Sequence, residues 1–78
     1  MPTVLLINGF RFFFYSNENN EPTHVHVTKG DGNCKMWLEP NINIAYMHGF
    51  TSAHQNEIMR IVVTNYELLK SKWHEFFN

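Results

Sequence analysis

In the first part of the chain, short apolar runs are separated by polar residues, a pattern typical of antiparallel strands. β-branched and aromatic runs at 3–7 and 10–15 flank Asn8-Gly9. Asn-Gly between such runs predicts a hairpin, because a type I′ turn needs positive φ at both central residues. The predicted pairs are Ile7 with Phe10, Leu5 with Phe12 and Thr3 with Phe14. Both faces of this hairpin are largely apolar, so one can pack on a helix and the other needs cover from the chain, a partner or a second copy.

Strict alternation resumes at 24–28 and returns at 33–39, which predicts a second hairpin. With Asp31-Gly32 as a two-residue turn, the predicted pairs are His24 with Glu39, His26 with Trp37 and Thr28 with Lys35. A four-residue connection would shift the register by one pair but keep the same residues on each face of the sheet. A three-residue loop would change which residues share a face. The alternation places His24 and His26 on one face, and the opposite, core-facing side takes Val25, Val27, Met36 and Leu38.

The rest of the chain predicts one helical region. In segment 41–49 apolar and polar residues alternate too briefly to distinguish a short edge strand from an irregular crossing. Helical spacing of the apolar residues begins at Ser52, which forms a capping-box pattern with Gln55. A helix from Ser52 to Phe77 would be about 39 Å long, so we expect a kink near 64–66 or protrusion of the last turns into a partner. The predicted fold is α+β: an antiparallel sheet of two β-hairpins packed against a long or kinked C-terminal helix, in one domain over residues 1–78.

Composition narrows the class of protein. A chain of 78 residues that is 44% hydrophobic and 15% aromatic is typical of a folded domain. Six Lys and Arg against seven Asp and Glu give a net charge of −1, which supplies no long-range field to gather phosphates, although a local patch stays open. The single Cys34 excludes an intramolecular disulfide, and no apolar stretch approaches the roughly 20 residues that span a bilayer. We expect a cytoplasmic protein with no membrane partner.

His24 and His26 are the candidate ligand-binding residues. Two residues apart on a strand, their α-carbons lie about 6.6 to 6.8 Å apart, so both rings could converge on one metal ion or one phosphate. A metal site needs a third protein ligand, for which Glu39 is best placed by pairing. The spacing matches no zinc signature. The sequence therefore favours a structural role, in which the histidines bond Glu39 or stack on Trp37, and keeps a metal site of His24, His26 and Glu39 as an alternative with no other cofactor expected.

The same face carries a catalytic hypothesis. An imidazole titrates near pH 6.5, which suits proton transfer, and a metal-free ribonuclease needs such a group beside a cation. His24 or His26 with Lys35 would supply these parts. Cys34 is expected to face the core, where burial raises the pKa of a thiol. The residues leave open whether the protein is an enzyme.

The aromatic residues at the end of the chain have two interpretations. Packing against the hairpin aromatics is the simpler one, and an exposed patch for a protein partner or a second copy is the other. The candidate partner-binding residues are Phe13, Tyr15, Trp73, Phe76 and Phe77.

Several motifs carry a family resemblance over nearly the whole chain. They lie at 1–4, 9–16, 21–27, 35–40, 49–51, Asn65 and 73–77, and they include Glu-Pro-x-His-Val-His with Trp-Leu-x-Pro downstream. This pattern resembles Domain of Unknown Function family 4160. The resemblance implies a short bacterial protein, often encoded beside a second small protein in an arrangement that looks like a toxin–antitoxin module, and it implies no catalytic residue. Segment 41–46 is more strand-like here than the family's usual connection.

Three hypotheses for function follow. The first is a component of a toxin–antitoxin-like module that acts on RNA through the histidine-bearing face. The alternative is a non-enzymatic protein-interaction module or homodimer, and the third is a metal-binding domain. The sequence names neither a substrate nor a toxin or antitoxin role.

Overall fold

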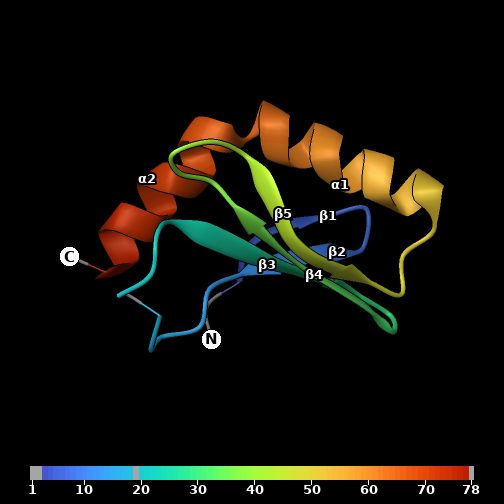
Figure 1. Cartoon of the computed structure of the whole chain (residues 1–78), viewed down its shortest axis with the longest axis horizontal. Coiled ribbons are helices and arrows are strands. Elements are labelled where there is room, and N and C mark those ends of the chain that lie inside the picture. The colour runs from blue at the N-terminus through green and yellow to red at the C-terminus, as the bar shows by residue number, and fades with distance from the viewer. Residues whose placement is uncertain (1–2, 19, 78) are drawn as a thin grey trace.

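Five strands form one antiparallel sheet, and two helices follow it. The computed structural model describes residues 3–18 and 20–77. The elements are β1 (Thr3–Ile7), β2 (Phe10–Phe13), β3 (His24–Lys29), β4 (Gly32–Trp37), β5 (Asn43–His48), α1 (Ser52–Thr64) and α2 (Tyr66–Phe77). The strands lie in sequence order across the sheet, and both helices lie on one side of it (Figure 1). This arrangement confirms the α+β prediction.

The first hairpin forms as the Asn-Gly signal predicts, up to its last pair. Asn8 and Gly9 have φ of 52° and 83°, the left-handed values that a type I′ turn requires. Ile7 pairs with Phe10 and Leu5 with Phe12, as expected. The ladder is then irregular between Thr3 and Leu5, so Thr3 lies opposite Phe13. The predicted partner Phe14 was wrong, because a bulge puts one extra residue into β1.

The second hairpin keeps the predicted faces but shifts its register. Lys29 pairs with Gly32, so the turn residues are Gly30 and Asp31 rather than Asp31 and Gly32. His24 therefore lies opposite Trp37, and His26 lies opposite Lys35. Two features explain the shift: Gly30 takes the left-handed φ of 56°, and the Phe50 ring occupies the space that a side chain at Gly32 would need. The predicted core-facing residues are fully buried, which confirms the faces: Val25, Val27, Met36 and Leu38.

Segment 43–48 is the edge strand that the sequence left as one of two alternatives. β5 pairs with β4, with Lys35 opposite Tyr46 and Met36 opposite Ile44. The register skips Ala45, so β5 contains a bulge. Most of β5 is exposed, including Ile44 at 49%.

The helical region is broken at Asn65, which confirms the predicted kink. The Asn65 backbone N–H donates to the carbonyls of Ile61 and Val63 at the end of α1, and its own carbonyl accepts from Leu69 in α2. The predicted cap at Ser52 was wrong by one residue, because the Thr51 side chain accepts from the His54 N–H. Within the described residues, neither helix is long and apolar enough to cross a membrane.

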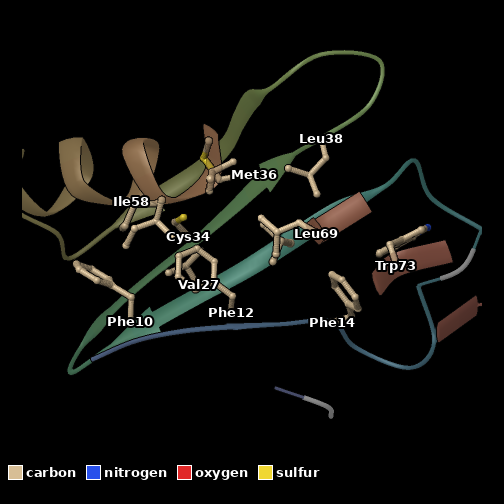
Figure 2. Packing of buried hydrophobic residues seen from close by; sticks show 13 residues of the cluster. Phe10, Phe12, Phe14, Val27, Cys34, Met36, Leu38, Ile58, Leu69 and Trp73 are labelled. Carbon is tan, nitrogen blue, oxygen red and sulfur yellow. The ribbon is translucent and has the colours of Figure 1, made fainter. Parts of the chain in front are cut away.

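Aromatic and aliphatic residues together form the core between sheet and helices (Figure 2). Phe10, Phe12 and Phe14 are fully buried there. The Trp73 ring of α2 meets the Phe14 ring edge-on at 5.2 Å. Trp73 also lies 4.7 Å from the His24 ring, so the same helix that closes the core reaches the histidines.

Candidate functional site

The two histidines of β3 are buried although they lie on the face of the sheet opposite the core. His24 is fully buried and His26 is 5% exposed. Aromatic rings enclose them: His26 stacks on Phe13 at 5.5 Å and meets Tyr15 edge-on at 4.6 Å, and His24 meets Trp37 edge-on at 5.3 Å. These apolar walls lower the local dielectric, so any charge held between the rings interacts strongly with its neighbours.

Glu18 joins the two histidines from the loop between β2 and β3. Its Oε1 atom lies 2.9 Å from the Nε2 atom of His24 and 2.9 Å from the Nε2 atom of His26. The loop turns back at this point, since the Glu21 N–H donates to the Glu18 carbonyl. One ligand atom from each of Glu18, His24 and His26 lies within 4.8 Å of the others. We call these three residues the Glu-His-His cluster.

The other ring nitrogens of the cluster also have neighbours. The Nδ1 atom of His24 lies 2.8 Å from the Pro22 carbonyl oxygen, which can only accept, so Nδ1 carries the proton. The Nδ1 atom of His26 lies 3.5 Å from the Tyr46 hydroxyl. Among the described residues, no buried side-chain nitrogen or oxygen lacks a hydrogen-bond partner. The cluster is therefore held in one orientation.

Burial and hydrogen bonding shift the pKa values in the cluster. Burial lowers the pKa of His26, and this effect outweighs the hydrogen bond and charge of Glu18, which raise it. Burial also acts to raise the pKa of Glu18, but the hydrogen bonds and charges of the two histidines prevail and hold the pKa of Glu18 below its ordinary value. The carboxylate is therefore ionised at neutral pH.

Lys35 lies on the face of the histidines, as predicted, but its charge is already paired. Its Nζ atom lies 2.7 Å from a Glu21 carboxylate oxygen and 4.3 Å from the centre of the Trp37 ring. A cation that stabilises the transition state of phosphodiester cleavage has to face the substrate. Lys35 would have to leave Glu21 to do so.

Glu39, the predicted third metal ligand, lies among other partners. Its carboxylate accepts from the Thr23 hydroxyl, and it lies 3.3 Å from the Nε2 atom of His74. Glu18 takes the place beside the histidines instead. Sequence reasoning missed Glu18 because a loop residue has no periodicity to orient it. The signal that could have identified Glu18 is that it lies close to the histidines along the chain. Buried histidines on a strand need hydrogen-bond acceptors, and the preceding loop supplies carboxylates.

The predicted partner-binding residues fall into two groups. Phe13 and Tyr15 enclose His26, with Phe13 2% and Tyr15 40% exposed. The others pack around Phe14: Trp73, Phe76 and Phe77. Of that second group only Phe76, at 40%, is substantially exposed. The structure therefore does not bring the five residues together into one surface.

The Glu-His-His cluster is better suited to binding a positive charge than to catalysing attack on a substrate. The fully buried His24 ring contacts Pro22, Glu18 and aromatic rings, so it cannot reach a bound molecule without displacement of the loop. Cys34 faces the core as predicted, where burial raises the pKa of its thiol to about 12 and leaves it protonated at neutral pH.

Comparison with known proteins gives one match. A family model described as Domain of unknown function (DUF4160) matches residues 9–74, a range that contains the whole Glu-His-His cluster. No curated protein and no solved structure matches the chain.

Proposed function

Because the chain belongs to the DUF4160 family, whose function is unknown, we propose a function from the surface of the chain. The chain is the protein-binding member of a toxin–antitoxin-like pair. It binds a strand of its partner protein at the outer edge of β1. The observation that carries the proposal is a pair of hollows along that edge. The gene arrangement implied by the family resemblance agrees with a protein partner.

The sheet has two open edges within the described residues. β1 and β5 are the outermost strands, and neither contains a charged residue or proline. Natural proteins usually protect an exposed edge with lysine, proline or a covering loop, because its free N–H and C=O groups can pair with another strand. Addition of an extended segment to such an edge is a common mode of peptide recognition.

The β1 edge is the better binding site because it is lined by hollows. One, of about 310 Å³, lies between Val4 of β1 and α2, where Phe76 forms part of its wall. The other, of about 330 Å³, lies between Ile7 of β1 and the end of α1. Alternate side chains of an added strand point toward the helices and would enter these hollows.

Exposed apolar side chains lie on both sides of this edge. Leu6 of β1 is 69% exposed and lies on the outer face with its pairing partner Arg11, and Leu68 of α2 is 41% exposed. Leu68 precedes Lys72 by one helical turn, so it lies on the side of α2 that borders the first hollow. The lining includes the cations Arg60 and Lys72 and the carboxylate Glu75. A partner strand with alternating apolar residues and an acidic residue beside them fits this surface.

An RNA-directed activity has less support. The net charge is −1, Lys35 is paired with Glu21, and both histidines are buried. Because contact with phosphates supplies most of the affinity for nucleic acid, this surface gives RNA little to bind. RNA cleavage that is lost on substitution of His26 would nonetheless displace the present proposal.

Binding to the second small protein that the family resemblance implies beside this chain's gene tests the proposal. The two proteins are purified separately, and their dissociation constant is measured by calorimetry for the wild type, Leu6→Lys and Ile44→Lys. A lysine on β1 would protect the edge, so we expect Leu6→Lys to weaken binding at least tenfold. Ile44→Lys is the control, because it places the same charge at an exposed position of the other edge strand.

Three results would contradict the proposal. The first is no complex between the two proteins. The second is a loss of binding in Ile44→Lys with none in Leu6→Lys, which would move the site to β5. The third is a wild-type dimer by light scattering that Leu6→Lys dissociates, which would make a second copy the occupant of the edge.

A further inference from the structure

We propose that Glu18, His24 and His26 bind one divalent transition-metal ion, for which Zn²⁺ is the best match. This inference goes beyond the proposed function and is independent of it, because the cluster contains none of the residues that line the β1 hollows.

The hydrogen bond of His24 to Pro22 directs its other ring nitrogen at Glu18. Its Nδ1 atom donates to the Pro22 carbonyl, so the Nε2 atom of a neutral ring presents a lone pair. That lone pair faces the Glu18 Oε1 atom at 2.9 Å, and two acceptors cannot bond each other. Either an additional proton or a metal ion must lie between them. A metal ion bound by both atoms satisfies the two acceptors at once.

The donor set matches the preference of Zn²⁺. Two imidazole nitrogens and one carboxylate oxygen form the His₂Glu set of known zinc sites, in which a water molecule takes the fourth position. The Glu18 side chain is 16% exposed, so water can reach the cluster from that side. Ligand atoms in a tetrahedral zinc site lie about 3.4 Å apart. The two oxygen-to-nitrogen separations of 2.9 Å therefore need a withdrawal of Glu18 by about half an ångström.

The surroundings of the cluster also have the features of a metal site. Histidines that bind metal usually donate their second N–H to a carbonyl or carboxylate, as His24 does to Pro22. Aromatic rings contact both imidazoles: Tyr15 meets His26, and Trp37 and Trp73 lie beside His24. Since Glu18 belongs to the loop and both histidines belong to β3, a bound ion would tie the loop to the sheet.

Titration of metal-free protein with ZnCl₂ tests this inference. The protein is purified without a histidine tag, stripped with a chelator and titrated by calorimetry in the wild-type, Glu18→Gln and His74→Gln forms. We expect one ion per chain in the wild type and binding at least tenfold weaker in Glu18→Gln. His74→Gln is the matched control because His74 also lies beside a carboxylate, that of Glu39, but at the surface. Its affinity should stay within twofold of the wild type.

A second measurement keeps the test independent of how well the variant folds. Co²⁺ added to the wild-type protein should produce the intense visible absorption of a tetrahedral site, and Zn²⁺ should displace it. Failure of the wild type to bind Zn²⁺, or a Co²⁺ spectrum that stays that of the hydrated ion, would overturn the inference. Equal affinity in Glu18→Gln and the wild type would do the same by assigning the binding to other histidines. None of these outcomes involves the partner protein, so they leave the proposed function untouched.

Discussion

Phe12 and Phe13 are neighbours in β2, yet they point to opposite faces of the sheet and are buried by different means. Phe12 is fully buried in the core beneath the helices. Phe13 is 2% exposed, but its cover consists of the Arg11 guanidinium at 4.5 Å, the stacked His26 ring and Tyr15. One face of the sheet is therefore buried by a layer of helices. The other is buried mainly by side chains of its own strands and one loop, with Trp73 of α2 reaching His24.

The difference shows which contacts each face depends on. On the helix-covered face, burial comes from many apolar contacts, so the loss of one large side chain leaves a cavity. On the outer face, burial depends on a few polar contacts that hold the loop, chiefly those of Glu18. Substitutions on the two faces should therefore differ in how much they lower the free energy of unfolding and in which contacts they remove.

The largest effect is expected from Phe12→Ala. Truncation of a fully buried phenylalanine typically costs about 3–5 kcal/mol, since the surrounding core cannot fill the cavity. Phe13→Ala should cost about 2 kcal/mol, because solvent can enter on the outer face and only the transfer free energy is lost. Urea unfolding followed by circular dichroism measures both values.

Phe12→Leu serves as the milder control if Phe12→Ala does not fold. An equal loss for Phe13→Ala and Phe12→Ala would remove the distinction between the two faces.

The next effect is expected from Glu18→Ala in metal-free protein. Loss of the carboxylate leaves two buried ring nitrogens without their partner, at a cost of about 1–3 kcal/mol in the free energy of unfolding. Glu67→Ala is the control, because the Glu67 side chain is 85% exposed and its ion pair with Lys70 should contribute little. Chemical denaturation of the two variants would separate them. If both match the wild type, the loop does not stabilise the outer face.

Cys34 gives a smaller, pH-dependent effect on the helix-covered face. Burial raises the pKa of its thiol to about 12, so the folded chain keeps a proton that the unfolded chain loses above its ordinary pKa of about 9. The stability contributed by this group is therefore complete below pH 9 and falls as pH rises toward 12, by about 1 kcal/mol at pH 10. Cys34→Ala should lack this part of the pH dependence.

Thiol reactivity provides an independent check on Cys34. A disulfide reagent at pH 8 should label the native protein far more slowly than the urea-unfolded protein, because the thiolate is the reactive form. Rapid labelling of the native protein would show that this side chain opens to solvent.

The smallest effect on stability is expected from Leu6→Lys. Leu6 is 69% exposed, so a lysine there should change the free energy of unfolding by less than about 0.5 kcal/mol. Thermal unfolding of this variant beside Ile44→Lys checks that the two edges tolerate charge equally. A larger loss for Leu6→Lys would mean that β1 is held by contacts of Leu6 rather than by its ladder to β2.

Local signals in the sequence predicted much of the fold. Asn8-Gly9 placed the first turn, and strict alternation in β3 and β4 assigned Val25 and Met36 to the core. The register of the second hairpin was not predictable in the same way, because Gly30 and Gly32 both suit a turn and alternation is unchanged by a shift of one pair. The Phe50 ring occupies the space that a side chain at Gly32 would need, and this contact comes from a later part of the chain that local signals do not describe.

For the candidate site, the sequence predicted only which residues share one face of the sheet. The period of a strand placed His24 and His26 side by side with Lys35, whereas the loop that carries Glu18 has no repeating geometry from which its direction follows. Glu39 was chosen by extending the ladder past Trp37, but β4 ends there and the Glu39 side chain turns to Thr23 and His74. A ligand set assembled from a strand and a loop depends on tertiary contacts that strand pairing does not contain.

The two uncharged edge strands also bear on how copies of the chain can assemble. Pairing of β1 in one copy with β5 in the next would join unlike surfaces, a contact that grows into a filament unless the rotation between copies closes a ring. A partner strand seated on β1 removes one of the two surfaces that such growth needs. A partner strand bound to β1, as we propose, would therefore stop such growth at that edge.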